Sequence, residues 1–269
     1  MSVAEAPDIE RGFDPFNLNA PHAIWNALRE ESPVFYHEPT GYVVVTRHAD
    51  IKAVFDDWQT FSSENAQAPM RPMCEEGKRI MREGGFTAYS GLSARVPPDH
   101  TRIRKIVQGA FGPRRFKAIE PQIEAIVARA LDGIAPNGRA DFFREVAYEV
   151  PALVLFTLMG IPAEDVPKVK DWAVSRALLT WGNLSDAEQI PHAHKMVEYW
   201  AYCRGLVAAR KETPGDDLPS DLVKLQAEGA EITDEEIAGV MYSVLFAGHE
   251  TTTTLMANAV ITLLTHRDS

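Results

Sequence analysis

A short segment late in the sequence, Ala247-Gly248-His249-Glu250-Thr251, combines two small residues with a carboxylate and a hydroxyl. Small residues leave room for a bulky group to lie against a helix backbone. The hydroxyl of Thr251 has few rotamers and can bond back to a carbonyl one turn earlier, which can open a helix locally, as bulges at functional sites do. The alternative is a buried helix with a small-residue crossing, in which each threonine is satisfied by its own backbone.

A second segment, residues 97–105, places cations at the start of a helix, because a proline pair precedes it. On the helical wheel His100 and Arg104 lie at the head of an apolar stripe, whereas Arg102 and Lys105 point the other way. The stripe consists of Ile103, Val107 and Phe111. Since a buried cation needs an anionic partner, one interpretation is an anionic ligand held between His100 and Arg104. The other is a pair that extends to the surface or meets remote acidic residues.

Metal-ligand patterns are weak in this sequence. His249-Glu250 lacks the second histidine that a zinc protease places four residues on, because that position is Thr253. His192 and His194 are two residues apart and would point away from each other on a helix. The only cysteines, at positions 74 and 203, have no second cysteine at metal-site spacing. We expect no metal site built from these residues.

The helix that carries the first segment has a clear start. Thr233-Asp234-Glu235-Glu236 fits a capping box, and Ile232 and Ile237 occupy the positions of a hydrophobic staple. Nothing breaks the helix until about His266, which gives a rod of roughly 50 Å at ~1.5 Å per residue. An ionisable pair in its middle disfavours a membrane span. We expect a helix buried on all sides.

The rest of the chain predicts a mainly α fold with a small N-terminal β-sheet. Two β-rich runs, 34–36 and 42–46, flank a turn at Pro39-Thr40-Gly41 and indicate a hairpin. Residues 64–98 are rich in proline and glycine without a period, which indicates a functional loop region. Helices are expected at residues 21–31, 49–55, 98–111, 115–134, 141–159, 163–181, 186–211 and 218–228.

Composition limits the classes of protein. The 269 residues include 38 acidic and 27 basic side chains, a formal charge of −11, which argues against a general nucleic-acid binder. Two cysteines cannot form a disulfide framework, and no signal peptide is visible, so we expect a cytoplasmic protein with no membrane partner.

Both segments resemble motifs of the bacterial cytochrome P450 monooxygenases. The run Pro97–Arg104 followed by Phe111 looks like the C-helix signature of that family. Ala247-Gly248-His249-Glu250-Thr251-Thr252 looks like its central I-helix motif. Val45-Thr46-Arg47 and Phe61-Ser62-Ser63 match the N-terminal region as well.

The resemblance implies a role for each matching residue. His100 and Arg104 match the positions that bond the haem propionates, and Ala247 and Gly248 match the place where the long helix covers the distal face of haem b. Glu250 and Thr251 match the acid–alcohol pair of the proton relay. Residues 64–96 correspond to the variable segment over the substrate pocket. The family oxidises small organic substrates with dioxygen and takes electrons from a ferredoxin- or flavin-type donor.

Two family features have no counterpart in the sequence. Haem iron in this family is held by a cysteine thiolate in a Phe-x-x-Gly-x-x-x-Cys-x-Gly loop, and neither Cys74 nor Cys203 has those neighbours. The Glu-x-x-Arg helix that braces the core in this family, expected after the long helix, is also absent. We therefore expect a single incomplete domain over residues 1–269, divided into 1–63, 64–96 and 97–269 and truncated after the I helix. Alone it should be inactive, without bound haem and prone to aggregate; the alternative is a non-catalytic remnant or a helical interaction module.

Overall fold

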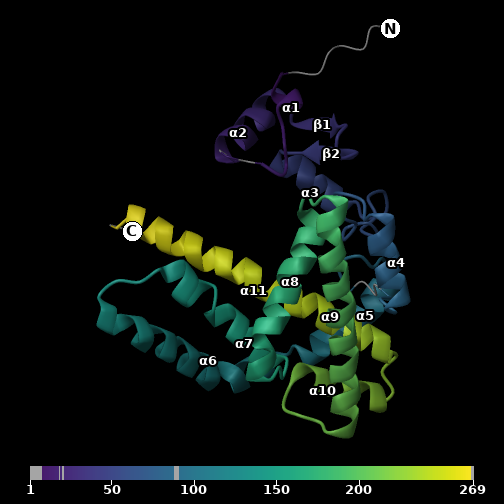
Figure 1. Cartoon of the computed structure of the whole chain (residues 1–269), viewed down its shortest axis with the longest axis vertical. Coiled ribbons are helices and arrows are strands. Elements are labelled where there is room, and N and C mark those ends of the chain that lie inside the picture. Colours follow the sequence, from purple (N-terminus) through teal and green to yellow (C-terminus); the bar gives the residue numbers. More distant parts are fainter. Residues whose placement is uncertain (1–7, 18, 20, 88–90, 268–269) are drawn as a thin grey trace.

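The computed structural model describes residues 8–17, 19, 21–87 and 91–267, and it is mainly helical with one small sheet. At the N-terminal end, β1 and β2 pair antiparallel, with Val34 opposite Val45 and His37 opposite Tyr42. Gly41 takes the positive φ of 72° that the turn between them requires. This hairpin packs with the nearby helices around its own small core of Phe13, Leu28 and Phe35 (Figure 1). The elements are α1 (Asp8–Arg11), α2 (Pro21–Glu31), β1 (Val34–His37), β2 (Tyr42–Val45) and α3 (His48–Asp56).

The remainder is a helical body that confirms the predicted α fold. Its core contains Trp172, Tyr199, Trp200 and Met241 from three long helices. The helices are α4 (Glu75–Glu83), α5 (Asp99–Ala110), α6 (Pro113–Ile134), α7 (Val150–Leu158), α8 (Val166–Trp181), α9 (Asp186–Glu212), α10 (Leu218–Ala227) and α11 (Asp234–Thr265).

Two features of local structure were not predicted. The loop-rich segment 64–96 contains one helix, α4, whose N-cap Cys74 accepts a hydrogen bond from the amide of Gly77. A proline- and glycine-rich context concealed this short helix. The helix expected over 141–159 is divided: a π-helical turn, η2 (Phe143–Ala147), precedes α7.

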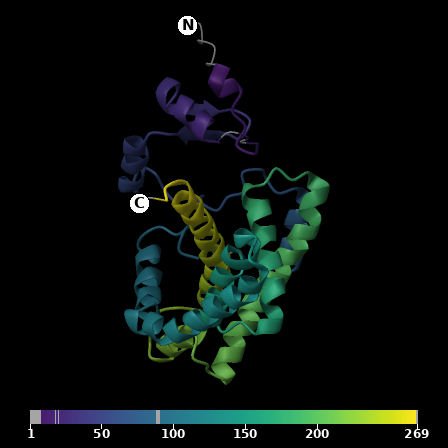
Figure 2. The same ribbon diagram turned by 90° about the vertical axis from the view of Figure 1, so that its left-hand side faces the viewer.

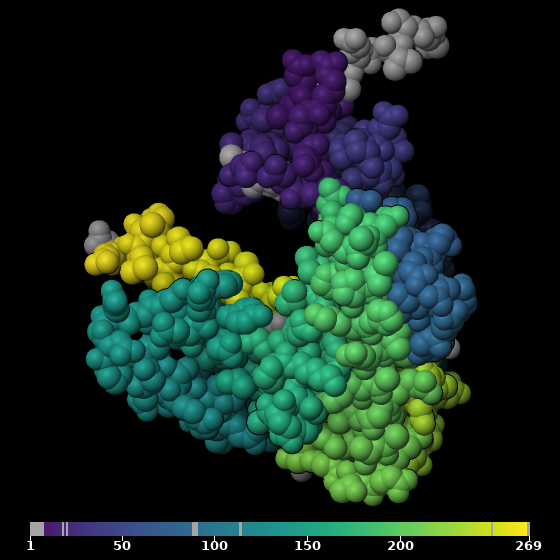
Figure 3. Space-filling view, viewed as in Figure 1, coloured from purple at the N-terminus to yellow at the C-terminus, as the bar shows by residue number. Residues whose placement is uncertain are grey.

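The expectation that the terminal helix is buried on all sides was also wrong. The first half of α11 packs against α7, α8 and α9, and Ile237 and Leu245 are fully buried. In the second half Leu255 and Ile261 are 67% and 60% exposed. Figures 2 and 3 show this half, in yellow, extending out of the helical body. No helix in the described part of the chain is both long and apolar enough to cross a bilayer.

Candidate functional site

The start of α11 is fixed as its sequence predicts. The Thr233 hydroxyl accepts from the Glu236 amide at 3.2 Å, and the Glu236 carboxylate accepts from the Thr233 amide at 2.9 Å. Ile232 and Ile237 are both buried, as the staple requires. Capping of this kind holds the first turn of the helix in place, so the residues further along it are held in register.

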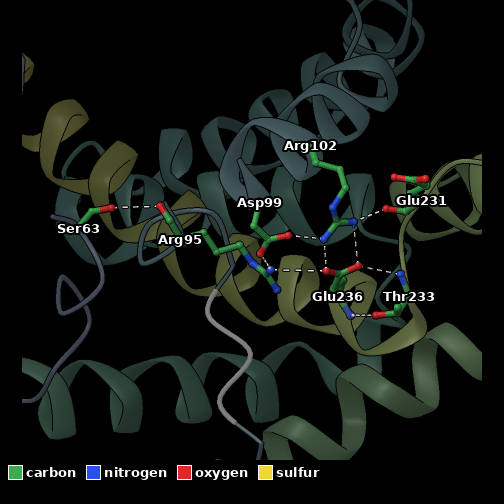
Figure 4. Close-up of polar contacts among 7 residues, drawn as sticks. All are labelled: Ser63, Arg95, Asp99, Arg102, Glu231, Thr233 and Glu236. Carbon is green, nitrogen blue, oxygen red and sulfur yellow. Dashed lines mark hydrogen bonds and ion pairs between the residues drawn. The ribbon is translucent and has the colours of Figure 1, made fainter. Parts of the chain in front are cut away.

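The Glu236 carboxylate also joins α11 to α5 through two arginines that the sequence did not single out (Figure 4). Arg102 Nη2 lies 2.5 Å from Glu236 Oε1, and Arg95 Nη1 lies 3.5 Å from the same oxygen. Both arginines also donate to Asp99 at the start of α5. Arg102 additionally donates to the carbonyl of Glu231. The helical wheel placed Arg102 on the face opposite His100 and Arg104, and the structure shows that Arg102 on this face pairs with Asp99 of α5 and Glu236 of α11.

The charges in this cluster stabilise its ionised state. Burial raises the pKa of Glu236, but hydrogen bonds from Arg102 and Thr233 and the charges of both arginines outweigh it, so the pKa lies below its ordinary value. The hydrogen bond from Arg102 similarly lowers the pKa of Asp99 against a smaller effect of burial. We call Arg95, Asp99, Arg102 and Glu236 the α5–α11 cluster.

The two cations expected to meet an anion lie on the same helix but outside the cluster. His100 is half-buried and Arg104 is exposed, which corrects the expectation that the stripe turns both toward the core. Ile103 and Val107 are buried as expected. Among the described residues, no side chain forms a hydrogen bond or ion pair with His100 or Arg104. Both side chains therefore remain available for an anion.

The predicted segment on α11 lies where the helix leaves the body. Thr251 Oγ1 donates to the Ala247 carbonyl at 3.1 Å, which confirms the predicted back-bond, although α11 continues as an unbroken helix. Ala247 is exposed, whereas Gly248 faces α7. A Cβ atom on Gly248 would lie 3.0 Å from the Leu155 side chain. The small residues thus do two things: Gly248 allows close helix packing, and Ala247 leaves an open surface.

Glu250 and Thr251 line an open cavity of about 510 Å³ between α11 and the segment around η2. Phe143 and Tyr148 form its other side. Burial raises the pKa of the Tyr148 phenol, and the negative charges of Glu149 and Glu250 raise it further. Glu250 is exposed and lines this cavity together with Thr251, so both residues are accessible to solvent.

A second cavity, of about 270 Å³, lies between α4, α8, α9 and α11. Its walls are mainly apolar, and they include Phe86, Met196 and Tyr242. Arg176 of α8 also lines it and is only 7% exposed. The sequence gives no sign that Arg176 lines a cavity, because this position depends on the packing of α8 against α11, which only the fold shows.

Neither cysteine is placed as a metal ligand. Cys74 Sγ caps α4 and donates to the Asp186 carbonyl at 3.6 Å. Cys203 is fully buried in the core, and burial raises the pKa of its thiol far above its ordinary value. Within the described ranges no three histidine, cysteine or acidic side chains form a group that could hold a metal ion.

Comparison with known proteins finds bacterial hydroxylases among the relatives of this chain. It is 33% identical over 257 residues to the vitamin D(3) 25-hydroxylase of Pseudonocardia autotrophica, covering 92% of this chain and 59% of that protein. It is 34% identical over 243 residues to the erythromycin C-12 hydroxylase of Saccharopolyspora erythraea, covering 89% of this chain and 56% of that protein. No family model matches the chain.

A solved structure is closer in sequence. Cytochrome P450 CREJ in complex with (4-ethylphenyl) dihydrogen phosphate is 52% identical, with a TM-score of 0.91 over 96% of this chain and 65% of that one. This chain thus spans less than two thirds of the length of these relatives. The similarity includes the whole helical body described above.

Proposed function

Because this chain belongs to the cytochrome P450 family, we propose that the complete protein is a haem-thiolate monooxygenase acting on a small organic substrate. It uses dioxygen and receives electrons from a ferredoxin- or flavin-type donor. The observation that carries this proposal is the exposed face of α11 at Ala247 and Thr251, together with His100 and Arg104 on α5, whose side chains have no partner among the described residues.

The residues present fit a haem. His100 and Arg104, whose side chains have no partner among the described residues, are suited to bind the two propionates, since these carboxylates are ionised acceptors of strong hydrogen bonds. Ala247 offers a surface without a large side chain, against which a flat macrocycle can lie. The haem, when bound, supplies the oxygen and electron-transfer chemistry. The α5–α11 cluster is suited to fix the position of α5 relative to α11, the two helices that would hold the haem.

Glu250 and Thr251 are suited to deliver protons to that surface. The Thr251 hydroxyl donates its one proton to the Ala247 carbonyl in this structure, which leaves its oxygen able to accept a hydrogen bond. Handing that proton to a group at the face of Ala247 requires the hydroxyl to rotate away from the carbonyl, while its oxygen takes up a replacement proton. Glu250 is exposed and can take protons from water. The role of the pair is therefore general acid catalysis next to the face of Ala247.

The thiolate that would hold the haem iron is not supplied by Cys74 or Cys203, because one caps a helix and the other is buried as a neutral thiol. We infer that it comes from a part of the complete protein outside these 269 residues. That part would also cover the exposed apolar side chains of the second half of α11. Residues 1–269 alone are accordingly inactive under this proposal.

For the substrate, we propose a small aryl phosphate. The basis is the 52% identity to a structure that holds such a ligand. The segment expected over the substrate pocket, residues 64–96, also lies against α11. Its Gly91 is so close to Ser243 of α11 that a Cβ atom at position 91 would collide with the Ser243 hydroxyl.

The reduced carbon monoxide difference spectrum of the haem-loaded complete protein tests the proposal. We expect the Soret band of a thiolate-ligated haem from the complete protein and none from residues 1–269. A complete protein without that band would support the second candidate, a non-catalytic remnant or helical interaction module. A thiolate band from residues 1–269 alone would contradict the ligand assignment.

A further inference from the structure

Arg176 is a buried cation held by neutral groups. Its Nη1 donates to the Tyr242 carbonyl at 2.8 Å, and its Nη2 donates to Gln67 Oε1 at 3.2 Å. The guanidinium lies over the rings of Tyr242 and Phe246, at 4.1 and 4.4 Å from their centres. These contacts fix its position and orientation within the helical body.

In the part of the chain that the structure describes, no acidic side chain neutralises this charge. Among the described residues none forms an ion pair with Arg176, and no carboxylate lines the cavity of about 270 Å³ beside it. Lys78 of α4 lines the same cavity and is half exposed. Removing a cation from water without an anionic partner is unfavourable, so a site of this kind gains stability when an anion enters.

The remaining walls suit an aromatic body. Phe86 and Tyr242 present rings, and Met73, Met81 and Met196 present thioethers, which pack well against aromatic edges. Leu179 and Pro69 are the other apolar residues. A cavity of this size holds a small ring system with one polar group.

The cavity and the proposed reaction surface share helix α11, because Tyr242 lines the cavity. Tyr242 precedes Ala247 by five residues, about 7.5 Å along the helix axis and about 140° around it. A ligand anchored by its charged end at Arg176 would have to extend past Tyr242 and part of the way around α11 to reach Ala247. Its uncharged end would be the part presented for oxidation.

We propose that Arg176 binds the phosphate of an aryl phosphate substrate, with Lys78 as a second cation at the mouth of the cavity. This inference rests on the proposed function, and it adds the residue that selects the anion. Two cations and no carboxylate favour a dianion over a neutral phenol, since Arg matches phosphate with two parallel hydrogen bonds.

Calorimetric titration of the haem-loaded complete protein tests this assignment, with 4-ethylphenyl phosphate, 4-ethylphenol and inorganic phosphate as probes. We expect the aryl phosphate to bind at least about tenfold more tightly than the phenol, equivalent to about 1.4 kcal/mol. Arg176→Gln should remove this preference and leave phenol binding within about twofold. Gln67→Glu should also remove the preference for the aryl phosphate while keeping the guanidinium of Arg176, because the new carboxylate would lie beside Arg176 Nη2.

The Gln67→Glu variant keeps the inference testable if Arg176→Gln does not fold. Arg79→Gln is the matched control, because this α4 residue pairs with Glu76 and Glu83 and does not line the cavity. Equal affinity of the wild-type protein for phosphate ester and phenol, or an unchanged preference in Gln67→Glu, would overturn the inference. Because calorimetry does not depend on turnover, a protein that lacks the thiolate spectrum but retains this preference would refute the proposed function alone.

Discussion

Arg102 of α5 and Glu236 of α11 are joined by an ion pair, with Arg102 Nη2 2.5 Å from Glu236 Oε1. Glu236 also completes the capping box that begins α11. One carboxylate therefore fixes both where the long helix starts and how it lies against the helix that carries His100 and Arg104.

Neutralising Glu236 should destabilise the protein strongly. In Glu236→Gln the charge of Arg95, whose side chain is 9% exposed, loses part of its compensation, and we expect the free energy of unfolding to fall by about 3 kcal/mol. Urea unfolding of the complete protein measures this change. In the control Glu83→Gln, an exposed pair with Arg79 is lost, and the change should stay below about 1 kcal/mol. Equal effects of the two substitutions would remove the structural role of the α5–α11 cluster.

The same cluster predicts acid sensitivity. The pKa values of Glu236 and Asp99 lie below their ordinary values of 4.5 and 3.8, so their contribution to stability is present above those values. It is lost as the pH falls below about 4.5 and through the lower pKa values of the folded state. Unfolding free energies measured between pH 7 and 3 should show this fall. Glu236→Gln should show a smaller one, and parallel curves would contradict the assignment.

Removing the Thr251 hydroxyl should uncouple the reaction. In Thr251→Ala of the complete enzyme we expect the product formed per NAD(P)H consumed to fall at least about tenfold, because proton delivery loses its final group. Thr262→Ala is the control, since Thr262 is also exposed and bonds back to the Asn258 carbonyl at 2.8 Å. Unchanged coupling in Thr251→Ala would remove this residue from the relay.

Arg104 should hold the haem without contributing to the folding of the polypeptide itself. The side chain is exposed and unpaired among the described residues, so Arg104→Gln should leave the melting temperature of the haem-free protein unchanged. The rate of haem transfer to an excess of a scavenging globin should rise by about tenfold. Lys105→Gln, next along α5 and also exposed, should change neither quantity. A haem-loss rate equal to that of Lys105→Gln would refute the proposed propionate contact.

Residues 1–269 on their own should associate. Four apolar side chains in the second half of α11 are more than half exposed, and such patches favour aggregation. They are Leu255, Ile261, Leu263 and Leu264. Size-exclusion chromatography should show oligomers, which replacement of Leu255 and Ile261 by lysine should reduce. A monodisperse monomer from the unaltered chain would contradict this expectation.

The sequence predicted features that depend on residues close together in the chain, but it did not predict contacts between residues far apart in the chain. The capping box at Thr233, the hairpin turn at Gly41 and the Thr251 back-bond depend on residues within one turn of each other, so the sequence states them directly. Arg95 and Glu236 are far apart in the chain, and only the fold brings them together. The same holds for Arg176, whose partners lie on α11 and in the 64–96 segment. The exposed second half of α11 was missed because apolar periodicity shows which residues can be buried, not whether a partner covers them.

A crystal structure of the haem-loaded complete protein would show directly where the haem lies. We expect one macrocycle to lie against Ala247, with its propionates within hydrogen-bond distance of His100 and Arg104. A macrocycle bound elsewhere, or propionates held by other residues while His100 and Arg104 face solvent, would contradict it.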